Sequence, residues 1–143
     1  MNGSKANDLT VAGVALRFGI VALILGTAYI HSTLGGLLFT LNATGYVVAA
    51  IAMIVPLGIA IRFRWFVRLG LIGYAATAIA AWAIMGPYYS TAYVAKGIEV
   101  ALITLLVIDF LRADGNPVAV VKRELAAGLA WVNARRAPGA ASA

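Results

Sequence analysis

Several ionisable side chains in this sequence lie inside long apolar runs, where charge is rare. A charged group at the centre of a bilayer costs roughly 2.5–3.5 kcal/mol on insertion scales, so each such group needs a partner or a function. Proton handling is one chemistry that these residue types support, because the imidazole of histidine titrates near neutral pH. The residues concerned are Arg17, His31, Lys96, Glu99 and Asp109.

Helical spacing predicts which of these residues meet. Arg17 and His31 share one face of the first apolar helix and are separated by about 21 Å along its axis. On the last apolar helix, Lys96 and Glu99 are one turn apart, and Asp109 lies about 15 Å further along. If these two helices pack antiparallel, Arg17 reaches Asp109, and Glu99 reaches His31 or Lys96.

Two interpretations of these pairings follow. The first is that Arg17 and Asp109 form a structural ion pair that makes the first and last helices neighbours. The second is that His31, Lys96 and Glu99 form a polar site for a proton or ligand, which would open on the outer side of the membrane.

The composition indicates an integral membrane protein. The chain is 63% hydrophobic and 11% charged, whereas a typical soluble domain is about 45–50% apolar and about 25% charged. Four apolar runs are each long enough to cross about 30 Å of hydrocarbon. They predict an all-α membrane protein whose four transmembrane helices form an up-down bundle. The transmembrane domain is expected at 11–112, with helices at about 11–31, 37–61, 65–85 and 92–111.

The segments outside these runs are polar or punctuated by Gly and Pro. Residues 1–10 are expected to form an N-terminal tail, and residues 113–143 a short amphipathic helix at the membrane interface followed by a disordered tail. Asn116 and Pro117 are typical of a helix start. Within the second apolar run, Pro56 is expected to kink the helix in its last turns.

The basic residues predict the orientation. If the N-terminus is cytoplasmic, Lys96 is the one basic residue of eleven on the outer side, in keeping with the positive-inside rule. Arg62, Arg64 and Arg68 then form a basic cluster at the inner leaflet. We therefore expect a multi-pass protein of the cell (inner) membrane with both termini in the cytoplasm.

The two halves of the chain share a short pattern. Residues 16–20 (LRFGI) match residues 67–71 (VRLGL), which places Arg17 and Arg68 at equivalent positions. A duplicated helical hairpin is one explanation, and the ease with which apolar sequences match is the other. If the duplication is real, Arg17 is expected to lie deeper than Arg68.

Several kinds of site are not indicated. Cysteine is absent, so disulfides, thiolate metal sites and iron–sulfur clusters are excluded. No metal-spaced acids and no Ser/His/Asp set can be assembled, so we expect neither a metal site nor catalysis by this chain alone. No cofactor is predicted, although a bound lipid or quinone would suit an apolar crevice between the helices.

Residues 93–102 (YVAKGIEVAL) look like the same position in uncharacterised four-helix proteins of similar size. Residues 16–19 (LRFG) open the first apolar helix, and residues 45–46 (GY) lie at the start of the second. Together with the four-helix layout, these two segments resemble the DoxX-like group of small bacterial and archaeal membrane proteins. The resemblance implies work beside quinone-linked oxidoreductases, but the lack of cysteine argues against an active redox role.

Three functions follow from these observations. The leading hypothesis is a non-catalytic accessory or structural subunit of a larger membrane complex in respiratory or photosynthetic electron transport. A small oligomeric transporter or proton-conducting channel using Glu99, Lys96 and His31 is the second. A DoxX-like, quinone-linked redox partner is the third. The expected partners are the lipid bilayer and other membrane subunits or further copies of this chain, and not nucleic acid.

Overall fold

The computed structural model describes residues 10–56, 58–86 and 88–136, and the regular structure in this part of the chain is helical. The all-α fold class is therefore confirmed. The predicted tails fall mostly on residues 1–9 and 137–143, which lie outside the described residues. The helices are α2 (Val11–Thr33), α3 (Leu37–Ile54), α4 (Gly58–Arg62), α5 (Arg64–Met85), α6 (Ser90–Ala113) and α7 (Pro117–Arg136).

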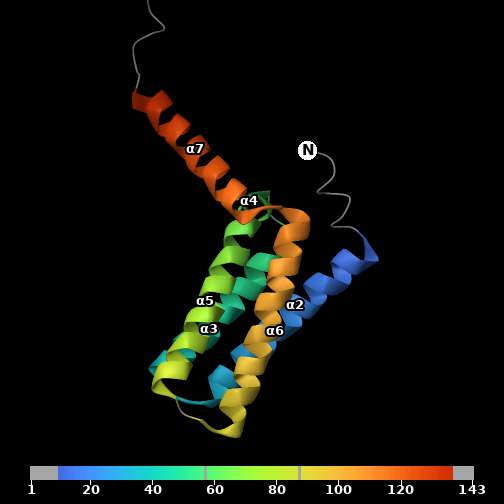
Figure 1. The fold of residues 1–143 in the computed structure, drawn as a ribbon, viewed down its shortest axis with the longest axis vertical. Coiled ribbons are helices and arrows are strands. Elements are labelled where there is room, and N and C mark those ends of the chain that lie inside the picture. The colour runs from blue at the N-terminus through green and yellow to red at the C-terminus, as the bar shows by residue number, and fades with distance from the viewer. Residues whose placement is uncertain (1–9, 57, 87, 137–143) are drawn as a thin grey trace, which may run out of the picture.

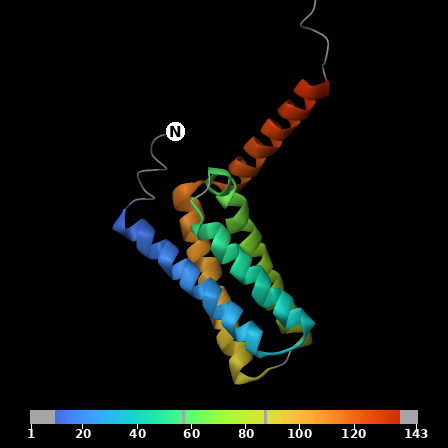
Figure 2. The ribbon, with the colours of Figure 1, turned by 180° about the vertical axis from the view of Figure 1, so that it is seen from behind.

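Four long helices pack as an antiparallel bundle (Figure 1). Helix α2 lies beside α3 and α6, and α5 lies beside α6 and α3. The prediction that the first and last helices of the bundle are neighbours is confirmed. We call one end of the bundle the α4 end, because α4 lies there with the starts of α2 and α5 and the end of α6. The opposite end, where the α2–α3 and α5–α6 connections lie, is called the turn end (Figures 1 and 2).

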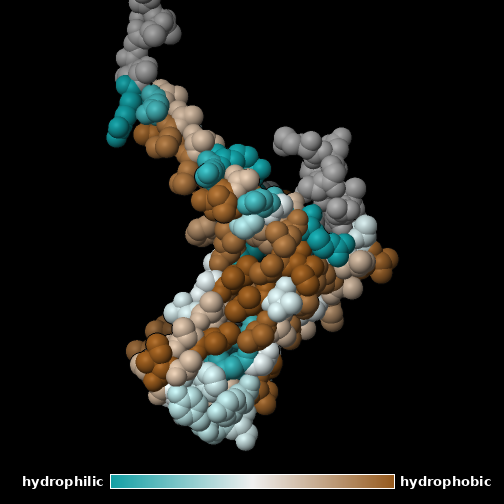
Figure 3. Space-filling view, viewed as in Figure 1, coloured by the Kyte–Doolittle hydropathy of each residue, from teal (hydrophilic) through white to brown (hydrophobic). Residues whose placement is uncertain are grey.

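Helices α2, α3 and α5 are long and apolar enough to cross a membrane. Helix α6 is not among these candidate spans, and it carries Lys96, Glu99, Asp109 and Arg112. Hydrophobic side chains cover most of the visible flank of the bundle, and hydrophilic ones gather towards α7 (Figure 3). Length, composition and surface together indicate a membrane protein.

Large apolar side chains fill the middle of the bundle. Ile20 and Ile24 of α2 and Leu102 and Leu106 of α6 are all fully buried, and they belong to one core cluster. Their spacing of four residues places each pair on one helical stripe, so the two stripes face each other along the α2–α6 contact. This apolar layer separates the polar groups near the two ends of the bundle.

The second predicted helix is interrupted where a single kinked helix was expected. Helix α3 ends at Ile54, Val55 is extended at φ −58° and ψ 124°, and α4 begins at Gly58. Proline lacks the N–H of a helical hydrogen bond, and its ring disfavours helical backbone at the preceding residue. Pro56 therefore ends α3, and the prediction of one helix at 37–61 is wrong.

The C-terminal helix begins as the sequence predicts. The side-chain Oδ1 of Asn116 accepts hydrogen bonds from the backbone N–H groups of Val118 (2.9 Å) and Ala119 (3.4 Å), and Pro117 is the first helical residue. Helix α7 projects from the α4 end of the bundle (Figures 1 and 2). Val120 is its one buried side chain. The apolar stripe of Val118, Val121, Leu125, Leu129 and Val132 is thus exposed in the described structure.

Candidate functional site

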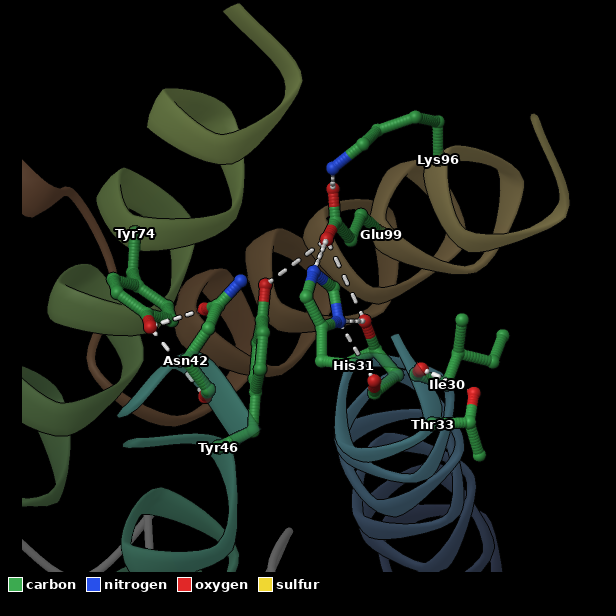
Figure 4. Close-up of polar contacts among 9 residues, drawn as sticks. Ile30, His31, Thr33, Asn42, Tyr46, Tyr74, Lys96 and Glu99 are labelled. Carbon is green, nitrogen blue, oxygen red and sulfur yellow. Dashed lines mark hydrogen bonds and ion pairs between the residues drawn. The ribbon is translucent and has the colours of Figure 1, made fainter. Parts of the chain in front are cut away.

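A buried carboxylate lies near the turn end of the bundle. Glu99 of α6 is fully buried, and its Oε2 accepts a hydrogen bond of 2.6 Å from the Lys96 ammonium one turn earlier. Its other oxygen, Oε1, accepts from the Tyr46 hydroxyl at 3.4 Å and from the Thr27 hydroxyl at 3.5 Å. Figure 4 shows Lys96, Tyr46 and His31 converging on this carboxylate from three helices. We call these five residues the Glu99 cluster: Thr27, His31, Tyr46, Lys96 and Glu99.

His31 is held in one tautomer by its own helix. Its Nδ1 lies 2.8 Å from the carbonyl oxygen of Thr27, which can only accept, so Nδ1 carries the proton. The other ring nitrogen, Nε2, faces Glu99 Oε1 at 3.8 Å. His31 thus adds a second nitrogen beside Glu99, further from the carboxylate than the Lys96 ammonium.

A second tyrosine extends the cluster towards α5. The Tyr74 hydroxyl donates to the side-chain oxygen of Asn42, and the Tyr74 ring meets Tyr46 edge-on at 5.0 Å between centroids (Figure 4). A Cβ atom at Gly45 would lie 3.2 Å from the Tyr74 hydroxyl oxygen. A residue without a side chain at this position therefore lets Tyr74 lie against α3.

A cavity of about 450 Å³ adjoins the Glu99 cluster at the turn end. This volume falls within the range of small-molecule sites, about 300–1,000 Å³. Its polar lining residues include His31, Asn42, Tyr74, Thr77 and Lys96. The rest of the wall is mainly apolar and aromatic and includes Leu34, Leu38, Phe39, Leu41, Ala78, Ala81, Trp82, Met85, Tyr89, Ala92 and Ala95. Such a wall suits a largely apolar molecule with one polar end.

The second buried carboxylate, Asp109, lies towards the α4 end. Arg68 of α5 donates from Nε to Asp109 Oδ2 at 2.6 Å and from Nη1 to Asp114 Oδ2 at 2.8 Å. The Nε of Arg17 lies 3.9 Å from Asp109 Oδ1. Two arginines thus balance two aspartates, and we call these four residues the Asp109 cluster. Its charge is compensated internally, as a structural network requires.

The structure brings Arg17 and Asp109 together as expected, but it makes Arg68 the nearer partner. Arg68 is 2% exposed. It therefore does not form an exposed basic cluster with Arg62, which is exposed and lies over the Phe63 ring. Arg64, the remaining residue of the predicted inner-leaflet basic cluster, is intermediate in exposure. The short repeated pattern could have indicated that Arg68 is a partner of Asp109. It places Arg68 at the position equivalent to Arg17, and both arginines reach Asp109.

Lys96, His31 and Glu99 also lie together as expected, with Lys96 nearer to Glu99 than His31 is. Sequence reasoning missed Thr27 and Tyr46. Thr27 could have been found because it lies one helical turn before His31 on the same face. Tyr46 is fully buried beside Glu99, although it was not among the predicted site residues.

Among residues 10–56, 58–86 and 88–136, no group of three or more His, Cys, Asp or Glu side chains could hold a metal ion. Comparison with models of known protein families, with characterised proteins and with solved structures gave no match. The geometry of the two clusters and the cavity therefore carries the functional argument.

Proposed function

We propose that this chain is a non-catalytic integral membrane protein that holds a small, lipid-soluble molecule in its turn-end cavity and serves as an accessory subunit of a larger membrane complex. The observation that carries the proposal is the cavity of about 450 Å³, which combines a mainly apolar wall with His31 and Lys96. Both of these side chains also border the buried Glu99 carboxylate. A bound lipid fits this wall, and a quinone is the candidate that the DoxX-like resemblance adds.

The proposal includes α6 as a fourth span. This helix packs beside both α2 and α5, and its 24 residues extend about 36 Å. Because it runs alongside two candidate spans, it crosses the same layer that they cross. Three of its charged residues are compensated within the bundle, since Lys96 pairs with Glu99 and Asp109 with Arg68. Arg112 lies in its last turn, where a membrane boundary is expected.

The proposed orientation has the α4 end in the cytoplasm at the cell (inner) membrane. Four spans return the chain to the side where it started, which suits the position of α2's start and α7 at one end (Figure 1). Arg62, Arg64 and Arg112 lie at that end, whereas Lys96 lies at the other, as the positive-inside rule requires. Helix α7 can then place its exposed apolar stripe on the inner leaflet.

The channel alternative is less well supported. Proton movement through one chain needs polar groups across the whole span, yet fully buried Ile20, Ile24, Leu102 and Leu106 separate the Glu99 cluster from the Asp109 cluster. We expect proton flux in liposomes that contain the purified protein to equal that in protein-free liposomes. Flux that is lost in Glu99→Gln would favour the channel over our proposal.

Purification in a mild detergent tests the proposal directly. Mass spectrometry of the purified sample should find a stoichiometric small molecule together with other membrane subunits. The variant for comparison is Ala81→Leu, which places a larger side chain on the cavity wall. This variant should lose the small molecule and keep the other subunits. A wild-type sample with neither partner nor small molecule would contradict the proposal.

A further inference from the structure

We infer that the cavity takes an uncharged amphiphile that carries a hydrogen-bond acceptor at one end, enters from the surrounding lipid and places its acceptor at Lys96. This inference rests on the proposed function and specifies the class of its ligand. It depends on three features of the site: charge, donors and the exposed part of the cavity wall.

The charge of the site is already compensated. The Lys96 ammonium lies 2.6 Å from the Glu99 carboxylate, whose side chain is fully buried. An anionic ligand would have to compete with Glu99 for Lys96 and would bring a second negative charge beside the first. A cationic ligand would meet the ammonium that lines the cavity. A neutral ligand avoids both of these electrostatic costs.

The donors of the site favour an acceptor on the ligand. An ammonium group has three N–H donors, and the Glu99 Oε2 contact uses one of those on Lys96. His31 Nδ1 is engaged by the Thr27 carbonyl, and its Nε2 becomes a donor only when the ring is protonated. Lys96 therefore places a charged donor on the cavity wall, with N–H groups left for a carbonyl or hydroxyl oxygen.

Part of the cavity wall is both apolar and exposed. Leu38 and Leu41 at the start of α3 and Met85 at the end of α5 line the cavity and are also largely exposed, at 76%, 60% and 76%. On the proposed membrane-spanning bundle, such side chains are in contact with lipid. The ligand can therefore reach the cavity sideways from the bilayer, with its apolar chain resting against these residues.

A matched series of fluorescence quenchers tests the inference. Trp82 lines the cavity, and Trp65→Phe with Trp131→Phe makes it the one tryptophan among the three in the chain. The probes are undecyl chains with bromine at one end and a ketone, a carboxylate, an ammonium or a plain methyl at the other. Quenching of Trp82 fluorescence is measured in nanodiscs at neutral pH. We expect the ketone to bind about tenfold more tightly than the plain alkane, because its oxygen accepts from a charged donor.

Variants of the cation identify the donor without leaving a buried charge. Lys96→Met combined with Glu99→Gln keeps the site neutral and should abolish the advantage of the ketone while leaving alkane binding unchanged. Lys96→Arg keeps a charged donor and should preserve that advantage. Equal binding of ketone and alkane to the wild-type cavity, or tighter binding of the carboxylate, would overturn the inference while the proposed function stands. Failure of every probe to quench Trp82 would overturn both.

Discussion

The two buried carboxylates of this protein have different surroundings. Asp109 has two arginines, and a second aspartate shares one of them, so the cluster is balanced. Glu99 has one lysine at 2.6 Å and three neighbours at 3.4–3.8 Å, and a cavity lies against two members of its cluster. A buried carboxylate thus joins helices through balanced ion pairs at one end, and at the other end it lies beside two side chains that line a cavity.

The difference between the clusters also bears on how each responds to the loss of a cation. Arg68 is buried and donates to both Asp109 and Asp114. Lys96 is 12% exposed in its side chain, and His31 lies next to the same carboxylate. We therefore expect the Asp109 cluster to be the less tolerant of the two.

The largest effect is expected for Arg68→Met. Removal of this guanidinium leaves the buried Asp109 with Arg17 at 3.9 Å, and breaking a buried ion pair costs about 3–5 kcal/mol of unfolding free energy. Unfolding in mixed micelles, followed by circular dichroism, measures the loss. The control is Arg62→Met, which removes an exposed cation at the end of α4. This substitution should change the unfolding free energy by about 0.5 kcal/mol or less. Equal losses in the two variants would show that Arg68 is not the main partner.

A smaller effect is expected for Lys96→Met. Glu99 keeps the Tyr46 and Thr27 hydroxyls as donors, and the His31 ring lies 3.8 Å from it. We expect a loss of about 1–3 kcal/mol, the range for leaving a buried polar group poorly satisfied. The same unfolding assay on Lys96→Met with His31→Ala should show more than the sum of the single losses. An additive result would show that His31 does not stabilise Glu99 when Lys96 is absent.

The next prediction compares the coupling energies of the two arginines of the Asp109 cluster with Asp109. A double-mutant cycle of Arg17→Met with Asp109→Asn should give a coupling energy of about 0–1 kcal/mol, because the pair is 3.9 Å apart and the Arg17 side chain is 24% exposed. The cycle of Arg68→Met with Asp109→Asn should give clearly more. Unfolding free energies in mixed micelles supply both cycles. A larger coupling for Arg17 would restore the sequence-based pairing.

The smallest effect on stability, within about 0.5 kcal/mol, is expected for Ala81→Leu. This substitution places a larger side chain on the cavity wall, so quenching of Trp82 by the ketone probe should fall severalfold. Ala80→Leu is the matched control, because Ala80 is exposed and does not line the cavity. Similar loss of quenching in both variants would mean that the cavity is not the binding space.

Much of the fold could be predicted because the periodicity and the length of the apolar runs indicate the helices directly. The α2 and α6 neighbours followed from matching charges on antiparallel helices, and Asn116 and Pro117 marked the start of α7. At Pro56 a kink within one helix was predicted, whereas the structure has an interruption between two helices. The sequence alone does not say whether neighbouring helices hold a proline kink in place. An apolar crevice between the helices was expected, but its position and lining residues were not predicted, because its wall combines residues from four helices.

The sequence by itself determined which residues are charged, how far apart they lie along each helix and which end of the bundle each belongs to. These follow from spacing along a helix of fixed rise. Only the tertiary structure decided that Arg68 is nearer to Asp109 than Arg17, and that Tyr46 and Thr27 complete the surroundings of Glu99. The physical reason is that partner choice depends on how each helix is rotated about its axis, and that rotation is set by the packing of apolar side chains such as Ile24 and Leu102 between the two clusters.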